Sequence, residues 1–268
     1  MNIGFLITAR LKSTRLTKKI LLPLNGYTVI ERVIHRAKQV IDSQKIILCT
    51  SMVNQDYPLV ETAVKNNIFY FNGHNDDVLL RLLNAAEFFG FDYFIGMTAD
   101  NPLFSFYHAL KIKDIINKDS SIDYVFTKQL PLGVNVYGIN VKAIRTVCEF
   151  KKEIDTEIWG PLINRSEIFN IKELKIEKKY QRKNYRLTLD EINDYKLIKH
   201  IYDYFDNVKI LDLLEVYKFL DGNPDIISIN DKVNQRNLDK DIIQRINNYY
   251  RSNLSEILSI KSKIYNSA

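Results

Sequence analysis

The first hundred residues alternate between short apolar runs and amphipathic stretches of about ten residues. Apolar runs of the kind that form buried strands occupy Ile3–Thr8, Ile46–Thr50, Ile68–Phe71 and Tyr93–Thr98. Between these runs, the spacing of apolar residues predicts helices over Val29–Val40, Tyr57–Lys65 and Asp77–Phe89. Strands that alternate with helices form βαβ units. The sequence therefore predicts the α/β class, with a mainly parallel, mixed central sheet flanked by helices.

The pattern changes after about residue 122. Further strands are predicted over Tyr124–Thr127, Val134–Ile139 and Tyr185–Leu189, and helices over Thr156–Asn164, Asp194–Phe205 and Leu211–Leu220. The stretch from Leu238 to about Ile264 is helical with one polar face, which fits a surface helix, a dimer contact or a partly frayed end. We expect one domain over 1–235, with halves at about 1–122 and 123–235, followed by a helical tail over 236–268.

Composition narrows the classes of function. No stretch approaches the roughly 18 unbroken apolar residues of a membrane span. The first residues also lack the basic region followed by an apolar stretch that is typical of a signal peptide. We therefore expect a cytoplasmic protein without membrane insertion. The net charge is +6, but basic and acidic residues are interleaved, so we do not expect a nucleic-acid partner. Two cysteines are too few for a disulfide framework or a zinc ribbon.

Three segments are predicted to converge in space. In a parallel sheet, ligands bind beyond the carboxyl ends of the strands. That rule selects the loop after Thr8, the corner at Thr50 and Ser51, and Asp100 with its neighbours. They are far apart in the sequence, so their meeting at one edge would mark a binding site.

The loop after the first predicted strand is basic. Residues 8–19 carry five basic side chains, Arg10, Lys12, Arg15, Lys18 and Lys19. A triphosphate carries about four negative charges, which arginine and lysine match by charge and geometry. Ser13 and Thr14 add hydroxyl donors, and loop N–H groups form anion-binding nests. Composition alone leaves a solvated basic loop equally open, but the position after a strand favours phosphate binding.

The stretch ITARLKSTRLTKKILLPLNGYTVIERVI resembles the opening of cytidylyltransferases, where a strand precedes a pattern like A-R-x-x-S-x-R-L-P-x-K. The resemblance is closest to the type named for spore-coat polysaccharide biosynthesis, and extends to 3-deoxy-manno-octulosonate cytidylyltransferases. It covers about residues 3 to 235 and continues through Cys49–Ser51, Gly73–Ala86, Thr98–Leu103, Tyr185–Tyr202 and Asn223–Asn230. It implies a Rossmann-like nucleotidyltransferase fold and transfer of CMP from CTP with release of pyrophosphate.

The resemblance also implies roles for individual residues. Arg10, Lys19 and Asp100 would be catalytic, with Arg10 and Lys19 on the triphosphate and Arg15 supporting them. Asp100 and Asp190 would bind Mg²⁺, which favours one or two carboxylates beside phosphate oxygens. An N-cap or turn role is a common alternative for an Asp. The implied nucleotide-binding set also includes Thr8, Ala9, Ser13, Thr50, Ser51, Asp76, Arg81 and Thr98.

Asp76 and Arg81 match a segment that lies near the nucleoside in the family. Helix capping and a surface salt bridge are equally open for these two residues.

The half that would bind the acceptor departs from the family pattern. A stretch like G-L-D-V-E becomes Gly133–Tyr137 here and loses both acids, at Asn135 and Tyr137, and Thr17 replaces a usual proline. The acceptor is left open between an acidic sugar and a phosphorylated small molecule. We expect its contacts among Lys128, Asn135, Tyr137, Glu157 and Trp159, although core packing is equally open for Trp159.

Two other functions stay open beside CTP-dependent transfer. One is a catalytically inactive nucleotide-binding paralogue, and the other is a sugar-phosphate nucleotidyltransferase that uses UTP or dTTP. The resemblance also suggests a homodimer and a place in the synthesis of surface polysaccharides such as a capsule.

Overall fold

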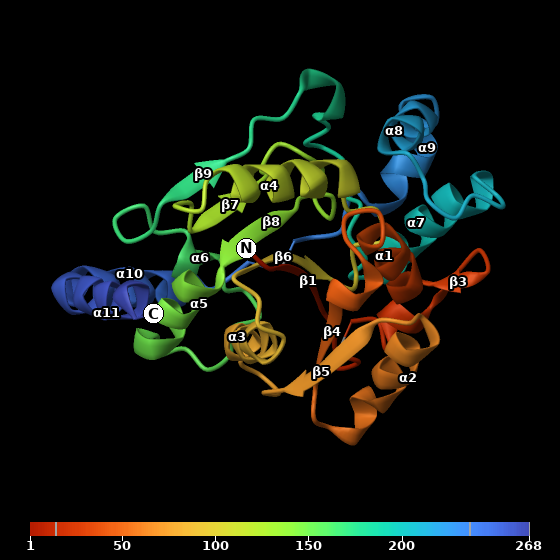
Figure 1. Ribbon diagram of the computed structural model, residues 1–268. Coiled ribbons are helices and arrows are strands. Elements are labelled where there is room, and N and C mark those ends of the chain that lie inside the picture. Colours follow the sequence, from red (N-terminus) through yellow and green to blue (C-terminus); the bar gives the residue numbers. More distant parts are fainter. Residues whose placement is uncertain (14, 236, 268) are drawn as a thin grey trace.

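A seven-stranded mixed sheet forms the middle layer of the protein, and helices cover both of its faces (Figure 1). The computed structural model describes residues 1–13, 15–235 and 237–267. The sheet has the order β5-β4-β1-β6-β8-β7-β9. Its strands are β1 (Ile3–Thr8), β4 (Ile46–Ser51), β5 (Phe69–Gly73), β6 (Tyr93–Thr98), β7 (Tyr124–Phe126), β8 (Tyr137–Asn140) and β9 (Ile171–Glu173). A separate two-stranded ribbon pairs β2 (Pro23–Leu24) with β3 (Tyr27–Thr28).

The four strands of the first half are parallel and follow the order of a doubly wound fold. Thr8, the last residue of β1, pairs with Cys49 on β4 and with Thr98, the last residue of β6. The strand β8 is antiparallel to β6 and to β7, and β9 is parallel to β7. The predicted α/β class with a mainly parallel mixed sheet is confirmed. Because β6 pairs with β8, both halves share one sheet, and the division near residue 122 stays a prediction.

The helices begin at residues that cap them. The hydroxyl of Thr28 accepts from the N–H of Glu31, whose carboxylate accepts from the N–H of Thr28 at 2.8 Å, a capping box that starts α1. Asp77 caps α3 by accepting from the N–H of Leu80. The helices are α1 (Val29–Ala37), α2 (Tyr57–Lys65), α3 (Val78–Phe88), α4 (Phe106–Lys118), α5 (Val141–Phe150), α6 (Gly160–Ile163), α7 (Ile192–Tyr204), α8 (Leu213–Asp221), α9 (Pro224–Ile227), α10 (Lys240–Ser252) and α11 (Leu254–Asn266).

Both faces of the sheet are packed. Phe5 and Ile7 of β1 lie in the core beneath α1, α2 and α4, whereas Leu6 lies in the core beneath α3 and α5. A third apolar cluster packs α7 and α8 against the ribbon residue Leu24. No helix within the described ranges is both long enough and apolar enough to cross a membrane.

Several elements differ from the sequence prediction. The helices α4 and α5 and the strand β9 were not predicted; α5 follows β8 without a loop, because Asn140 ends the strand and caps the helix. The predicted strand over Tyr185–Leu189 is wrong. That segment makes only one isolated bridge, from Arg186 to Leu132, while Leu187 and Leu189 are buried in the third cluster. Their alternation arises from burial rather than from sheet pairing.

The tail consists of two helices that meet at Asn253 and pack on the core (Figure 1). Ile246, Tyr250 and Ile257 are buried beside α5 and α6. At its far end, the buried carboxylate of Asp123 accepts from the hydroxyl of Tyr265 and, at 2.9 Å, from Nζ of Lys261. The tail as predicted, 236–268, begins and ends at residues that lie outside the described ranges.

We expect Asp123→Ala to destabilise the protein by about 3 kcal/mol, because it leaves Lys261 and Tyr265 without their buried partner. Urea denaturation measures this change. The matched control is Asp203→Ala, which removes an exposed ion pair with Lys199 and should leave the midpoint unchanged. Equal destabilisation by the two substitutions would contradict the anchoring role of Asp123.

Candidate active site

A cavity of about 320 Å³ lies where β1 and β6 end. Thr8, Ala9 and Arg10 enter it from β1, and Thr98, Ala99 and Asp100 enter it from β6. The other lining residues are Lys12, Ser13, Arg15, Lys19, Ile20, Asp76, Val78, Arg81, Asp155, Glu157, Trp159 and Asp190. The structure therefore brings most of the predicted nucleotide-binding set together at the edge where a parallel sheet binds ligands.

The ammonium of Lys19 lies between two carboxylates. Its Nζ is 2.6 Å from Oδ2 of Asp100 and 2.8 Å from Oδ1 of Asp190. Asp100 follows β6, and Asp190 precedes α7. The N–H of Leu189 donates to the carbonyl of Asp100 at 3.0 Å, so the two acidic segments are also joined through the backbone. The two predicted metal ligands thus face one cation.

The charges of this cluster reinforce one another. Burial on its own would lower the pKa of Lys19, but the charges of Asp100 and Asp190, and hydrogen bonds to both, raise it above its usual value. Burial would likewise raise the pKa of Asp190, but Lys19 and the two arginines Arg15 and Arg186 lower it below its usual value. Lys19 therefore stays cationic and Asp190 stays anionic around neutral pH.

A buried network orients Asp190. Arg186 donates to Asp190 at 2.9 Å through Nη2 and to Asp194 at 2.8 Å through Nε. The fully buried carboxylate of Asp194 also accepts from the N–H groups of Asp190, at 2.9 Å, and Glu191, at 3.0 Å. Asn230 donates to Asp194 at 2.8 Å. The sequence analysis missed these supports, although Arg186, Asp190 and Asp194 follow one another at intervals of four.

Arg10 is paired with the start of α3. Its guanidinium lies 3.0 Å from Oδ1 of Asp76 and donates to the carbonyl of Asn75. The hydrogen bond from Arg10 lowers the pKa of Asp76 most. Desolvation acts in the opposite direction, and the charges of Lys12 and Arg10 lower the pKa further. Asp76 remains half exposed, so an incoming anion can compete for Arg10.

Arg81 is buried, which excludes the surface salt bridge left open for it. Its Nη1 donates to the carbonyls of His74, at 2.5 Å, and Asn75, at 3.2 Å. Its Nε and Nη2 are buried without a hydrogen-bond partner among the residues that the structure describes. Because Arg81 lines the cavity and an unsatisfied buried donor is costly, these two donors fit a ligand carbonyl or hydroxyl.

Thr50 and Ser51 do not line the cavity, so direct nucleotide contact by either residue stays a prediction that this geometry does not support. Thr50 is fully buried, and Ser51 donates to the buried carboxylate of Asp56. Asp56 also accepts from the N–H of Leu11 at 2.7 Å. The corner after β4 therefore supports the basic loop from below. Thr14, a predicted hydroxyl donor of that loop, lies outside the described residues.

Two of the predicted acceptor contacts reach the cavity. Glu157 and Trp159 line it, and the ring of Trp159 also meets Tyr137 edge-on at 4.9 Å. Tyr137 does not line the cavity, because it packs behind Trp159. Asn135 is held by Thr127 at 3.0 Å and the carbonyl of Leu130 at 3.1 Å, and Lys128 is exposed. Direct acceptor contact is therefore not supported for Lys128, Asn135 or Tyr137, whose side chains the structure directs into packing, loop support or solvent.

The pair Asp100 and Asp190 meets the requirement of a magnesium ion that takes only one or two protein carboxylates. Within the described ranges, no group of three or more His, Cys, Asp or Glu side chains is placed to hold a metal ion. Thr98 donates to Asp100 at 2.6 Å and fixes the orientation of that carboxylate. A metal held here would depend on phosphate oxygens for its other ligands.

We expect the contribution of Asp190 to stability to depend on pH. Its pKa is lower in the folded state, so its stabilisation is complete above the usual Asp pKa of about 3.9 and is lost as the pH falls through the folded value. Asp190→Asn should therefore lower the free energy of unfolding at pH 7, with a gap that shrinks below about pH 4. Urea denaturation at pH 7 and pH 3 measures it. A gap of equal size at both pH values would contradict this coupling.

The comparisons with known proteins agree with this geometry. The family model described as cytidylyltransferase matches residues 5–213. An uncharacterized protein of Methanocaldococcus jannaschii is 32% identical over 88% of this chain and 97% of its own length. The spore coat polysaccharide biosynthesis protein SpsF of Bacillus subtilis is 26% identical over 84% of this chain and 96% of its own length.

Solved structures show the same fold. A cytidylyltransferase from Leptospira borgpetersenii is 25% identical, with a TM-score of 0.79 over 89% of this chain and all of its own. A CMP:2-keto-3-deoxy-manno-octonic acid synthetase complexed with CTP is 13% identical, with a TM-score of 0.60 over 76% of this chain and all of its own. The chain therefore belongs to the cytidylyltransferase family and is a nucleotidyltransferase.

Proposed function

We propose that this enzyme transfers CMP from CTP to an oxygen of a small acceptor and releases pyrophosphate. The observation that carries the proposal is the convergence of Arg10, Arg15 and Lys19 with Asp100 and Asp190 in one cavity at the sheet edge. Cations for a triphosphate and carboxylates for a divalent metal thus lie side by side. The structural neighbour that is complexed with CTP shares this fold and supports CTP as the nucleotide.

The chemistry is a substitution at phosphorus. The acceptor oxygen forms a bond to the α-phosphorus of CTP, the bond from that phosphorus to the pyrophosphate oxygen breaks, and the acceptor proton leaves to solvent. No protein nucleophile is required, because such transfer depends on positioning and charge stabilisation. Arg10 and Lys19 offset the charge that develops on the leaving pyrophosphate, and Arg15 lies beside them on Asp190 at 3.3 Å.

Asp100 and Asp190 would hold Mg²⁺. The metal would offset the charge of the phosphates and activate the attacking oxygen as a nucleophile. Their carboxylates already accept one cation, the ammonium of Lys19, between them. When the triphosphate enters, Lys19 exchanges these carboxylates for phosphate oxygens. This exchange keeps every charge paired, both in the free enzyme and in the complex.

The acceptor lies on the side of Glu157 and Trp159. An acidic sugar or a phosphorylated small molecule could pair with the cations Arg10, Arg15 and Lys19 that line the same cavity. The name of the Bacillus relative supports a place in surface polysaccharide synthesis. The enzyme acts as a homodimer in this proposal. The loss of acids at Asn135 and Tyr137 favours an inactive paralogue only if these positions contact the substrates, and neither of them lines the cavity.

We expect Arg10→Ala and Asp100→Ala each to reduce pyrophosphate release by at least about 100-fold. Arg10→Ala removes a cation that offsets the phosphate charge, and Asp100→Ala removes a carboxylate that would hold the metal. The assay offers CTP and Mg²⁺ with a panel of sugar acids and phosphorylated metabolites. Melting curves should show that both variants stay folded.

The matched control for these variants is Lys18→Asn. Lys18 belongs to the same loop but does not line the cavity, and asparagine tolerates its φ of 50°. It should keep near wild-type turnover. Turnover retained in Arg10→Ala or Asp100→Ala would overturn the proposed mechanism.

Nucleotide choice is tested by thermal shift with CTP, UTP, dTTP and ATP in the presence of Mg²⁺. A ligand at 100 times its Kd stabilises the folded state by roughly 2.7 kcal/mol. We expect CTP to raise the melting temperature most. A larger shift with UTP or dTTP would favour a sugar-phosphate nucleotidyltransferase instead.

A further inference from the structure

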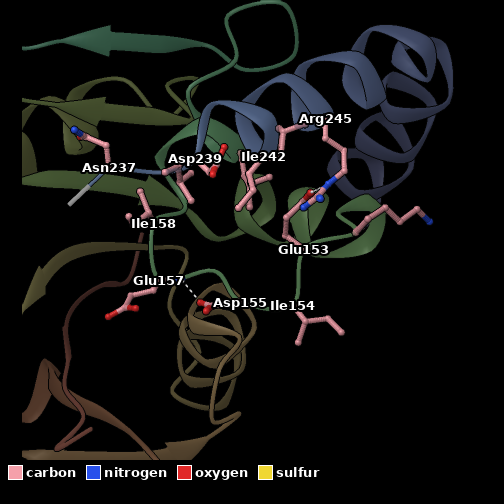
Figure 2. Close-up of a pocket in the computed structure, with 13 residues that line it drawn as sticks. Glu153, Ile154, Asp155, Glu157, Ile158, Asn237, Asp239, Ile242 and Arg245 are labelled. Carbon is pink, nitrogen blue, oxygen red and sulfur yellow. Dashed lines mark hydrogen bonds and ion pairs between the residues drawn. The ribbon is translucent and has the colours of Figure 1, made fainter. Parts of the chain in front are cut away.

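A second cavity, of about 480 Å³, lies between the segment 152–158 and α10 of the tail (Figure 2). It is lined by Lys152, Glu153, Ile154, Asp155, Glu157, Ile158, Leu162, Asn237, Leu238, Asp239, Ile242, Arg245 and Ile246. Asp155 and Glu157 also line the nucleotide cavity, so the two cavities adjoin across this segment. The match of the family model ends at residue 213, so α10 lies outside the matched segment.

The shared segment is tied to the nucleotide side. Between its two acids, the buried Thr156 donates to Asp77 at 2.9 Å and accepts from the N–H of Leu79 at 2.9 Å. These bonds attach it to the start of α3, next to the Asp76 that pairs with Arg10. A molecule in the second cavity would therefore contact a segment whose position is fixed relative to the triphosphate site.

The second cavity combines an apolar floor with acidic walls. The buried Leu162 and Ile246 line the cavity together with Ile158 and Ile242. Figure 2 shows Ile158 and Ile242 on either side of Asp239. Six charged side chains line the cavity, the cations Lys152 and Arg245 and the acids Glu153, Asp155, Glu157 and Asp239, and Arg245 lies 3.7 Å from Glu153. The acids therefore outnumber the cations by two, although Asp155 also accepts from the N–H of Glu157 at 3.1 Å and Asp239 from that of Asp241 at 2.8 Å.

We propose that this second cavity binds the body of the acceptor, as a polyhydroxylated ring that is neutral or carries an amino group. Carboxylates accept hydrogen bonds from hydroxyl and ammonium groups, and the apolar floor packs against the C–H face of a pyranose. The acidic walls repel an anionic ring. An acidic group on the acceptor would therefore lie beyond Asp155 and Glu157, in the nucleotide cavity, where the basic loop lies. The inference rests on the proposed function and narrows its acceptor class.

The test uses the full chain with ¹³C-labelled isoleucine methyl groups and three sugar probes. Glucosamine is cationic, N-acetylglucosamine is neutral and glucuronic acid is anionic. We expect the first two to shift the signals of Ile158 and Ile242, and glucuronic acid to leave them unchanged. Shifts with none of the probes, or with glucuronic acid alone, would overturn the proposal.

Three variants keep the test independent of folding defects. Ile242→Trp fills the cavity and should weaken the binding of glucosamine and N-acetylglucosamine by at least about tenfold. Leu258→Trp, at an exposed position of α11, should leave their binding unchanged. Ile154→Arg, at an exposed wall position, should weaken glucosamine more than N-acetylglucosamine, because it adds a competing cation. Equal binding by Ile242→Trp and the wild type would overturn the assignment.

CTP binding is measured separately in each protein. It should be unchanged in Ile242→Trp, because Ile242 does not line the nucleotide cavity. Failure of the wild type to bind CTP would refute the proposed function, and would do so whatever the sugar signals show.

Discussion

The ammonium of Lys19, held between Asp100 and Asp190, joins the basic loop to two acidic segments from distant parts of the chain. Without this cation, two carboxylates would face each other at the edge of a cavity, which raises the free energy of the charged state. Arg186 and Asp194 hold Asp190 from behind, and Thr98 holds Asp100. The site is thus preorganised as a set of opposite charges, which nucleotide and metal can enter by exchanging partners.

The fold places those charges by strand register. Thr8 and Thr98 end neighbouring parallel strands and pair directly, so the residues that follow them diverge around one cavity. The loop after β1 is supported from below by Asp56, which binds the N–H of Leu11 and the hydroxyl of Ser51. The second half contributes Asp190 and Trp159, and the tail adds a wall outside the segment that the family model matches. The two cavities are therefore lined largely by different parts of the chain, and they share Asp155 and Glu157.

The sequence predicted the four parallel strands and the convergence of their ends, because apolar runs that alternate with helical stripes have few other solutions. It did not predict α5, which starts at the last residue of β8 without an intervening turn signal. It predicted a strand over Tyr185–Leu189 because Leu187 and Leu189 alternate with polar residues, yet they are buried against helices. Tertiary packing imposes that alternation, and a local pattern does not reveal it.

The candidate site shows the same limit. Arg10, Lys19 and Asp100 could be selected because charge after a strand is informative in a parallel sheet. The partners of Asp190 could not, because Asp194 and Asn230 become significant only once burial makes each hydrogen bond necessary. Thr50 and Ser51 also stand at the end of a parallel strand, but they are buried beneath the loop rather than in the cavity. Position in the chain identifies the edge of the sheet, whereas side-chain direction decides which residues meet the ligand.

The most direct test of the charge-exchange account is the electron paramagnetic resonance signal of free Mn²⁺, titrated with the protein in the absence and presence of CTP. The account predicts little Mn²⁺ uptake by the protein alone, because Lys19 occupies Asp100 and Asp190. With CTP, uptake should exceed the amount that CTP binds by itself, and Asp190→Asn should reduce that excess. Equal uptake with and without CTP, or no excess over CTP alone, would contradict the account.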